Sequence, residues 1–116
     1  MLPYSIYQKG KYRVIKIDED ILFKTDISEL NIVIKDMLDQ GKRIIAVCFK
    51  PISMLNTKAV SDFVQCIEMI SNSKGELAVV TPSKYIRGFL HAIDFDHVVK
   101  VCNNEEELEQ EKIVSV

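Results

Sequence analysis

The chain has 116 residues, of which 47% are hydrophobic and 28% charged, and this composition is typical of one globular domain with its own buried core. Its 15 basic and 17 acidic residues give a formal net charge of −2. This balance predicts no general attraction to nucleic acid or to anionic lipid.

Strand patterns open the chain. Apolar residues predict one strand over residues 12–17 and another over 21–23, with the acidic stretch 18–20 as the turn between them. Asp26 and Glu29 then resemble a capping box, in which Asp replaces Ser or Thr. Apolar residues recur at helical spacing behind this box, so we expect a helix that starts near Asp26.

The central part of the chain alternates between a strand and a helix. Gly41 is a natural stop for the first helix, and the near-continuous apolar run over residues 43–49 predicts a strand that is buried on both faces. A second helix follows, and either Asn56 or Thr57 can cap it. Lys74 and Gly75 close this helix. Its expected buried stripe consists of Val60, Phe63, Val64, Ile67 and Ile70.

The last third repeats this alternation. Residues 77–80 predict a strand, and Thr81 with Pro82 predicts the cap and first position of a third helix. A final strand over 98–101 precedes an acidic helix that begins at Asn104. The order β-β-α-β-α-β-α-β-α predicts an α/β fold with a mixed sheet, in which the strands near 43 and 77 are parallel neighbours. We expect a core that includes Ile45, Val47, Phe63, Ile67 and Val79.

Residues typical of catalysis or metal binding are few. The four glycines stand far apart and form no phosphate-binding loop, and His91 and His97 lack the spacing of a metal site. The central strand ends in Phe49 and Lys50, without the acceptor aspartate of a phospho-receiver domain. We therefore expect neither enzyme activity nor a cofactor nor a bound metal.

Cys48, Cys66 and Cys102 form no CxxC pair and lie in apolar segments, so we expect three reduced core thiols. The sequence shows no signal peptide and no apolar run long enough to span a membrane, which predicts a cytoplasmic protein without direct membrane insertion.

One connection places a hydroxyl group where it could take part in binding or be phosphorylated. Residues 52–60 join the buried central strand to the second helix and place the Thr57 hydroxyl at the helix start. Unpaired backbone N–H groups and the helix dipole favour negative charge there, and Lys58 could supply a further counter-charge to a phosphate. The spacing fits equally a threonine that only caps the helix.

Two stretches resemble the STAS family, whose members include bacterial anti-sigma factor antagonists. Residues 43–60 read RIIAVCFKPISMLNTKAV and look like the family's central strand and its Asp-Ser-Ser-Gly-Leu signature. In this match Asn56 replaces the Asp and Thr57 holds the phosphoacceptor position. Residues 75–108 resemble the family's later strands and helices. The family's early Gly-Glu-Leu-Asp segment has no counterpart here.

This resemblance implies one STAS-like domain over residues 1–116, with a mixed sheet and helices packed mainly on one face. It implies a regulator that binds a protein partner, an anti-sigma factor that is also a serine/threonine kinase, rather than nucleic acid. Thr57 would be the phosphoacceptor, with Ser53 as the competing acceptor. The implied contact patch consists of Ser53, Asn56, Lys58, Ser61 and Asp62.

Two alternatives remain open from the sequence. The first is a STAS scaffold that is not phosphorylated, or an accessory subunit of a larger complex such as a membrane transporter. The second is an enzyme or a small-molecule carrier, which would need a deep pocket with convergent polar groups. The sequence does not indicate an oligomeric state.

Overall fold

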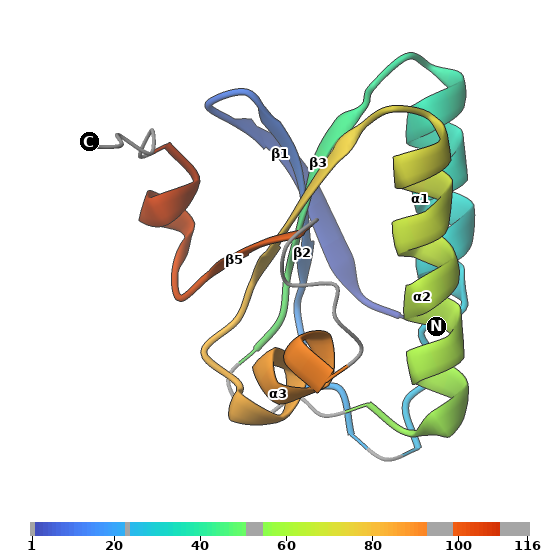
Figure 1. Ribbon diagram of the computed structural model, residues 1–116, viewed down its shortest axis with the longest axis vertical. Helices are drawn as coiled ribbons and strands as arrows, with labels where there is room; N and C mark the ends of the chain where they lie inside the picture. Colours follow the sequence, from blue (N-terminus) through green and yellow to red (C-terminus); the bar gives the residue numbers. More distant parts are fainter. Residues whose placement is uncertain (1, 23, 51–54, 93–98, 110–116) are drawn as a thin grey trace.

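A computed structural model describes residues 2–22, 24–50, 55–92 and 99–109 of the chain (Figure 1). Its strands are β1 (Tyr4–Lys9), β2 (Tyr12–Ile17), β3 (Ile44–Cys48), β4 (Glu76–Val80) and β5 (Val99–Cys102). Its helices are α1 (Glu29–Asp39), α2 (Thr57–Asn72) and α3 (Lys84–Ala92), and a short 3₁₀ helix, η1 (Glu105–Glu109), follows the last strand.

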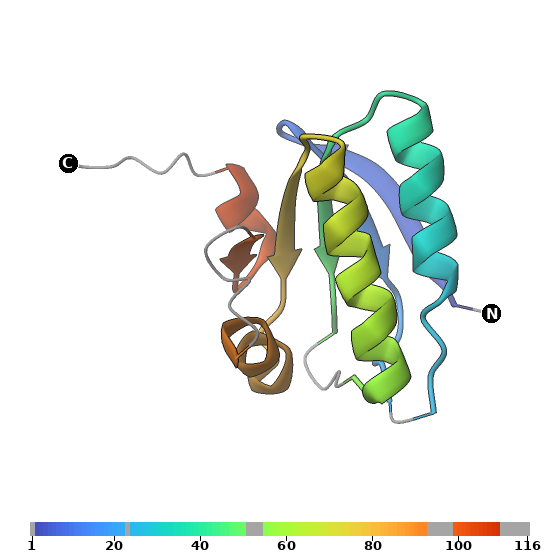
Figure 2. The ribbon, with the colours of Figure 1, turned by 45° about the vertical axis from the view of Figure 1, so that its right-hand side comes forward.

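The five strands form one mixed sheet in the order β1-β2-β3-β4-β5. The first two strands pair as an antiparallel hairpin, and each later strand joins its neighbour in parallel. Figures 1 and 2 show α1 and α2 side by side on one face of the sheet, while η1 lies on the other face. The predicted α/β fold, with a mixed sheet and with β3 and β4 as parallel neighbours, is confirmed.

The opening hairpin differs from the prediction. The sequence patterns placed a strand at residues 21–23, whereas the first strand is β1, which precedes β2. Gly10, with a φ of 58°, allows the tight reversal between the two strands. Ile21 is fully buried although it lies in a loop, and Leu22 is exposed. Residue 23 lies outside the described residues.

The predicted capping box at the start of α1 is wrong. The helix begins at Glu29, and the Asp26 carboxylate accepts a hydrogen bond of 2.9 Å from the Ser28 backbone N–H in the turn before it. The Glu29 carboxylate instead accepts a hydrogen bond of 3.0 Å from the Leu2 backbone N–H. Both carboxylates thus fix the polypeptide that leads into the helix. At the other end, Gly41 has a φ of 84° and follows the helix as expected.

The start of α3 is also shifted by two residues. The helix begins at Lys84, and the Ser83 hydroxyl accepts a long hydrogen bond of 3.4 Å from the Ile86 N–H. The predicted cap, Thr81, accepts a hydrogen bond of 2.9 Å from the Ser83 N–H and so shapes the preceding turn. The last helix begins next to Asn104, as expected, but it is a single short 3₁₀ segment.

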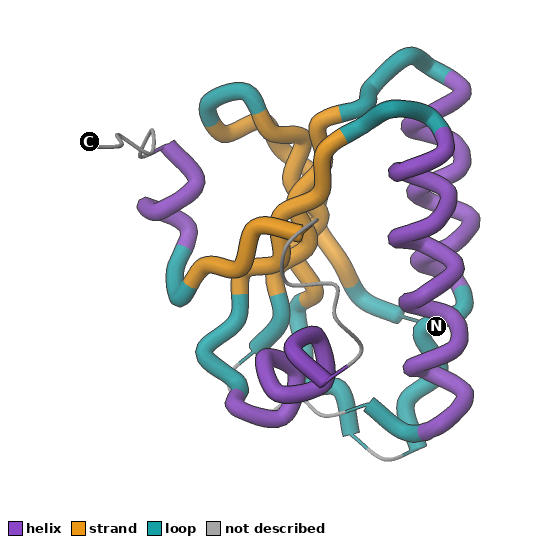
Figure 3. The backbone as a smooth tube through the Cα atoms, in the orientation of Figure 1, coloured by secondary structure: helices purple, strands orange, loops and turns teal. Residues whose placement is uncertain are grey.

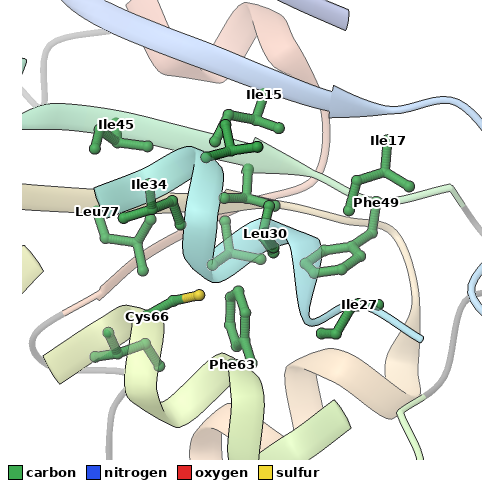
Figure 4. Close-up of a cluster of buried hydrophobic side chains, with 14 of the residues drawn as sticks. Ile15, Ile17, Ile27, Leu30, Ile34, Ile45, Phe49, Phe63, Cys66 and Leu77 are labelled. Carbon is green, nitrogen blue, oxygen red and sulfur yellow. The ribbon is translucent and has the colours of Figure 1, made fainter. Parts of the chain in front are cut away.

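The main core lies between the sheet and the two long helices (Figure 4). Phe63 of α2 is completely buried and meets Phe49 edge-on, with ring centroids 5.6 Å apart. The five side chains that the sequence assigned to the core are each at most 4% exposed, which confirms this part of the core. These residues are Ile45, Val47, Phe63, Ile67 and Val79.

The buried stripe of α2 differs in part from the prediction. Val60 and Val64 are only partly buried, whereas Ala59 and Cys66 are buried.

Small side chains line the opposite face of the sheet. Ala46, Cys48 and Ala78 are buried there, and Leu108 of η1 packs against this cluster. All three cysteines are buried, and none of them forms a disulfide in the described part of the chain. Burial raises the pKa of the thiols of Cys48 and Cys66 to about 12, so both stay protonated near neutral pH. Cysteine therefore serves here as a small packing residue.

Two glycines provide a matched test of this packing. A methyl group on Gly75 would lie 2.4 Å from the backbone oxygen of Arg43, whereas one on Gly88 in α3 meets no atom within 4 Å. We expect Gly75→Ala to lower the free energy of unfolding by about 1–3 kcal/mol, because the backbone before β3 and the backbone before β4 must move apart. Gly88→Ala should raise it by about 0.5–1 kcal/mol, because alanine favours the helix. Urea unfolding followed by circular dichroism measures both, and an equal effect of the two changes would contradict the close packing of Gly75 against Arg43.

Candidate functional site

The candidate site lies at the edge of the sheet where the parallel strands end. The connections that leave these strands and lead into α2 and α3 gather at this edge, which is drawn in teal in the lower part of Figure 3. Thr57 is the first residue of α2, and its side chain is exposed. This edge is a common place for binding sites in sheets of parallel strands, because loops there can vary without disturbing the core.

The structure resolves which residue caps α2. The Asn56 side-chain oxygen accepts a hydrogen bond of 2.7 Å from the Ala59 backbone N–H. Asn56 therefore fills the capping role that the sequence left open between two residues. The exposed Thr57 hydroxyl is not needed as the cap, and it stands beside the positive end of the helix dipole.

Lys58 holds two parts of the site together. Its ammonium group lies 2.9 Å from a carboxylate oxygen of Asp62, one turn further along α2, and 3.5 Å from one of Asp26, in the connection before α1. The hydrogen bond to Asp62 and the charge of Asp26 raise the pKa of Lys58. The Ser28 hydrogen bonds, with a smaller effect from Lys58, lower the pKa of Asp26.

These contacts change what Lys58 can do for a phosphate. The sequence indicated that Lys58 could supply a counter-charge to a phosphate on Thr57, but its charge is already shared by two carboxylates. Asp26 and Lys58 are each about two-thirds exposed, so water and salt screen this pair. A phosphoryl group next to Lys58 would therefore compete with Asp26 and Asp62 for the same cation.

Most of the predicted contact patch comes together on the first two turns of α2. Asn56, Thr57 and Lys58 begin the helix, and Ser61 is exposed on the next turn. The Asp62 side chain is only 15% exposed. Asp62 therefore offers a partner less surface than the sequence indicated. Ser53 lies outside the described residues.

Two large exposed side chains that the sequence analysis did not assign to the site lie in the segments that follow β2 and β4. Leu22, between β2 and α1, is 55% exposed, and Tyr85, in the first turn of α3, is 67% exposed. Tyrosine is enriched among the residues that dominate binding at protein interfaces. The sequence analysis missed Leu22 because an apolar residue in a loop carries no pattern that shows whether its side chain is exposed.

Metal binding finds little support in the described ranges, where no group of three or more His, Cys, Asp or Glu side chains is placed to hold an ion. The described residues at this edge provide the exposed Thr57 hydroxyl, Lys58 with its two carboxylate partners, and the exposed side chains of Leu22 and Tyr85. Such a surface is suited to contact another macromolecule.

Comparison with known proteins identifies the family. A family model described as "STAS domain" matches residues 4–108. The chain belongs to the STAS domain family. Among curated proteins, none matches this STAS domain.

Two solved structures of a protein from Thermotoga maritima share the STAS fold seen here. The NMR structure of this protein, TM1081, is 21% identical with a TM-score of 0.66, and the alignment covers 96% of this chain and 87% of that chain. The crystal structure is 19% identical with a TM-score of 0.66 and covers 92% and 90%; its description calls that protein a candidate anti-sigma factor antagonist. At this identity the likeness establishes the fold.

The helices of the described segments do not combine the length and the apolar character that crossing a lipid bilayer requires.

Proposed function

We propose that this STAS domain, taken as a single unit over residues 1–116, is a cytoplasmic bacterial regulator of the anti-sigma factor antagonist type. In this role it binds an anti-sigma factor that is also a serine/threonine kinase, it affects transcription through that partner, and it catalyses no reaction itself. The observation that carries the proposal is the exposed Thr57 at the first position of α2, where Asn56 already provides the cap.

In this proposal Thr57 is the phosphoacceptor. A phosphoryl group adds about −1.5 to −2 charges at neutral pH. The positive end of the α2 dipole offsets part of this charge, by about 0.3–1 kcal/mol. Ser53 in the same connection is the competing acceptor. The polar part of the contact consists of Asn56, Lys58, Ser61 and the exposed part of Asp62. Its apolar part consists of Leu22 and Tyr85.

Phosphorylation would release the partner for an electrostatic reason. The apolar part of the contact excludes water from the interface, and a doubly charged group inside it must lose its hydration. Lys58 cannot neutralise that group fully, because Asp26 and Asp62 already share its charge. The unmodified Thr57 hydroxyl, in contrast, is uncharged, and its burial in the contact costs little desolvation free energy.

One sequence feature favours a second candidate function. Asn56 stands where the family signature has Asp, so a carboxylate that could assist phosphoryl transfer is missing. A STAS domain of this kind would bind its partner constitutively, as a scaffold or as an accessory subunit of a larger complex such as a membrane transporter. The same surface would then be used without a switch.

Affinity capture from lysate of the native cells separates these functions. The wild-type chain as bait should retain an anti-sigma factor with a kinase domain, identified by mass spectrometry. Thr57→Glu should lose it, whereas Ser71→Glu should keep it, because Ser71 is exposed near the far end of the same helix. Retention by all three baits would favour the constitutive scaffold, and recovery of transporter subunits alone would contradict the antagonist function.

A further inference from the structure

An open depression of about 390 Å³ reaches from the β1–β2 hairpin to the carboxyl ends of β2, β3 and β4, beside the segment that leads from β5 into η1. In Figures 1 and 2, η1 stands on the face of the sheet that α1 and α2 leave uncovered. Apolar side chains form part of the lining, contributed by Ile17, Cys48, Phe49 and Val80. A volume of this size suits a small organic molecule rather than a single ion.

Three lysines line the same depression. Lys9 and Lys16 belong to the paired strands β1 and β2, and Lys50 follows β3. The Lys16 ammonium group lies 3.9 Å from a carboxylate oxygen of Glu105, which is the outer limit of an ion pair. For Lys9 and Lys50, the described part of the chain provides no ion pair. Ammonium groups above an apolar surface favour an anionic ligand.

Two asparagines add hydrogen-bond donors at the rim. The side-chain oxygen of Asn103 accepts a hydrogen bond of 2.6 Å from Arg87, and that of Asn104 accepts one of 3.2 Å from the Glu107 N–H. Because both oxygens are engaged, the amide N–H₂ groups are what these side chains can offer a ligand. Donors from an amide and an ammonium group together suit a carboxylate or phosphate oxygen.

Two acids also line the depression, and one of them is already engaged. The Glu105 carboxylate accepts a hydrogen bond from the Tyr7 hydroxyl and shares the charge of Lys16. Glu106 is exposed to solvent, where water screens its charge. Three lysines against two glutamates leave the lining with a net charge of +1.

We propose that this depression binds a small organic anion, in which a carboxylate or phosphate group on a short apolar body meets Lys16 and Lys50. Lys9, nearer the hairpin end of the lining, adds to the positive charge around it. The charged group contacts the first two of these lysines and the asparagine amides, while the body rests against Cys48 and Val80. Such binding does not depend on Thr57. It would give the domain a small-molecule input that is separate from its contact with a protein.

Titration with phenyl phosphate, followed by ¹H–¹⁵N NMR, tests this site. Saturable shifts are expected at the backbone amides of Lys16, Cys48, Val80 and Asn103. Lys50→Gln and Lys16→Gln should each raise the Kd about fivefold, which corresponds to about 1 kcal/mol. Benzyl alcohol, which lacks the charge, and inorganic phosphate, which lacks the apolar body, should both bind more weakly.

Lys42→Gln is the matched control, because this exposed lysine makes the same charge change at the opposite edge of the sheet, between α1 and β3. It should change the Kd less than twofold, and so should Thr57→Ala. Equal weakening by Lys42→Gln would reduce the effect to net charge and overturn the proposal. Benzyl alcohol or inorganic phosphate binding as tightly as phenyl phosphate would also overturn it, as would shifts confined to residues outside the depression.

Discussion

Phe63→Ala is expected to lower the free energy of unfolding by about 3–5 kcal/mol. Phe63 is fully buried in α2, and its ring packs edge-on against Phe49 at the end of β3. Alanine would leave a cavity between the helix and the sheet that the surrounding side chains fill only in part. Urea denaturation at equilibrium, followed by circular dichroism, measures the loss.

Tyr85→Ala is the control for this prediction, because it also removes an aromatic ring, but from a side chain that is 67% exposed. It should change the free energy of unfolding by about 0.5 kcal/mol or less. A loss below about 1 kcal/mol for Phe63→Ala would mean that the buried face of α2 is assigned wrongly. Such an error would also displace Thr57, since the same helix positions it.

Phosphorylation of Thr57 should weaken binding of the kinase partner by roughly 100-fold, which is about 2.7 kcal/mol. The added charge must be desolvated in the proposed contact, and truncating or mismatching a charge in a buried contact costs energy of this order. Isothermal titration calorimetry with the purified partner, before and after phosphorylation, gives the ratio of the two Kd values.

Two variants separate charge from shape in this measurement. Thr57→Val keeps the size of the side chain and removes the hydroxyl, so it should bind within about threefold of the wild type and resist phosphorylation. Ser71→Glu adds a charge near the other end of α2 and should leave the Kd unchanged within the same margin. Folding stability should change little in either case, because both positions are exposed. Weak binding by Thr57→Val would indicate that the hydroxyl itself is a contact.

Sequence patterns predicted the central elements well because these are strongly periodic. The apolar run of β3 and the stripe of α2 leave one arrangement that buries their side chains. β1 was missed because it is an edge strand that buries few of its side chains, so its sequence YSIYQK has no clear alternation. Residues 21–23 were interpreted as a strand because Ile21 is apolar, yet a loop residue can also fill a core.

The candidate site was predictable only along one helix. Asn56, Thr57, Lys58 and Ser61 are close in sequence, so the start of α2 brings them together. The contact between Lys58 and Asp26 joins residues on separate connections, and no local pattern predicts it. Their pairing depends on how α1 and α2 pack against each other, which is a property of the fold.

The most direct test of the switch is to map the site of phosphoryl transfer. The purified chain is incubated with its cognate kinase and Mg²⁺-ATP, and the modified peptide is sequenced by tandem mass spectrometry. We predict one phosphoryl group on Thr57, lost in Thr57→Val and accompanied by weaker partner binding. Phosphate on Ser53 alone would contradict the assignment of Thr57. No phosphate at all, with full partner binding by both Thr57→Ala and Thr57→Glu, would contradict the switch itself and leave a constitutive scaffold.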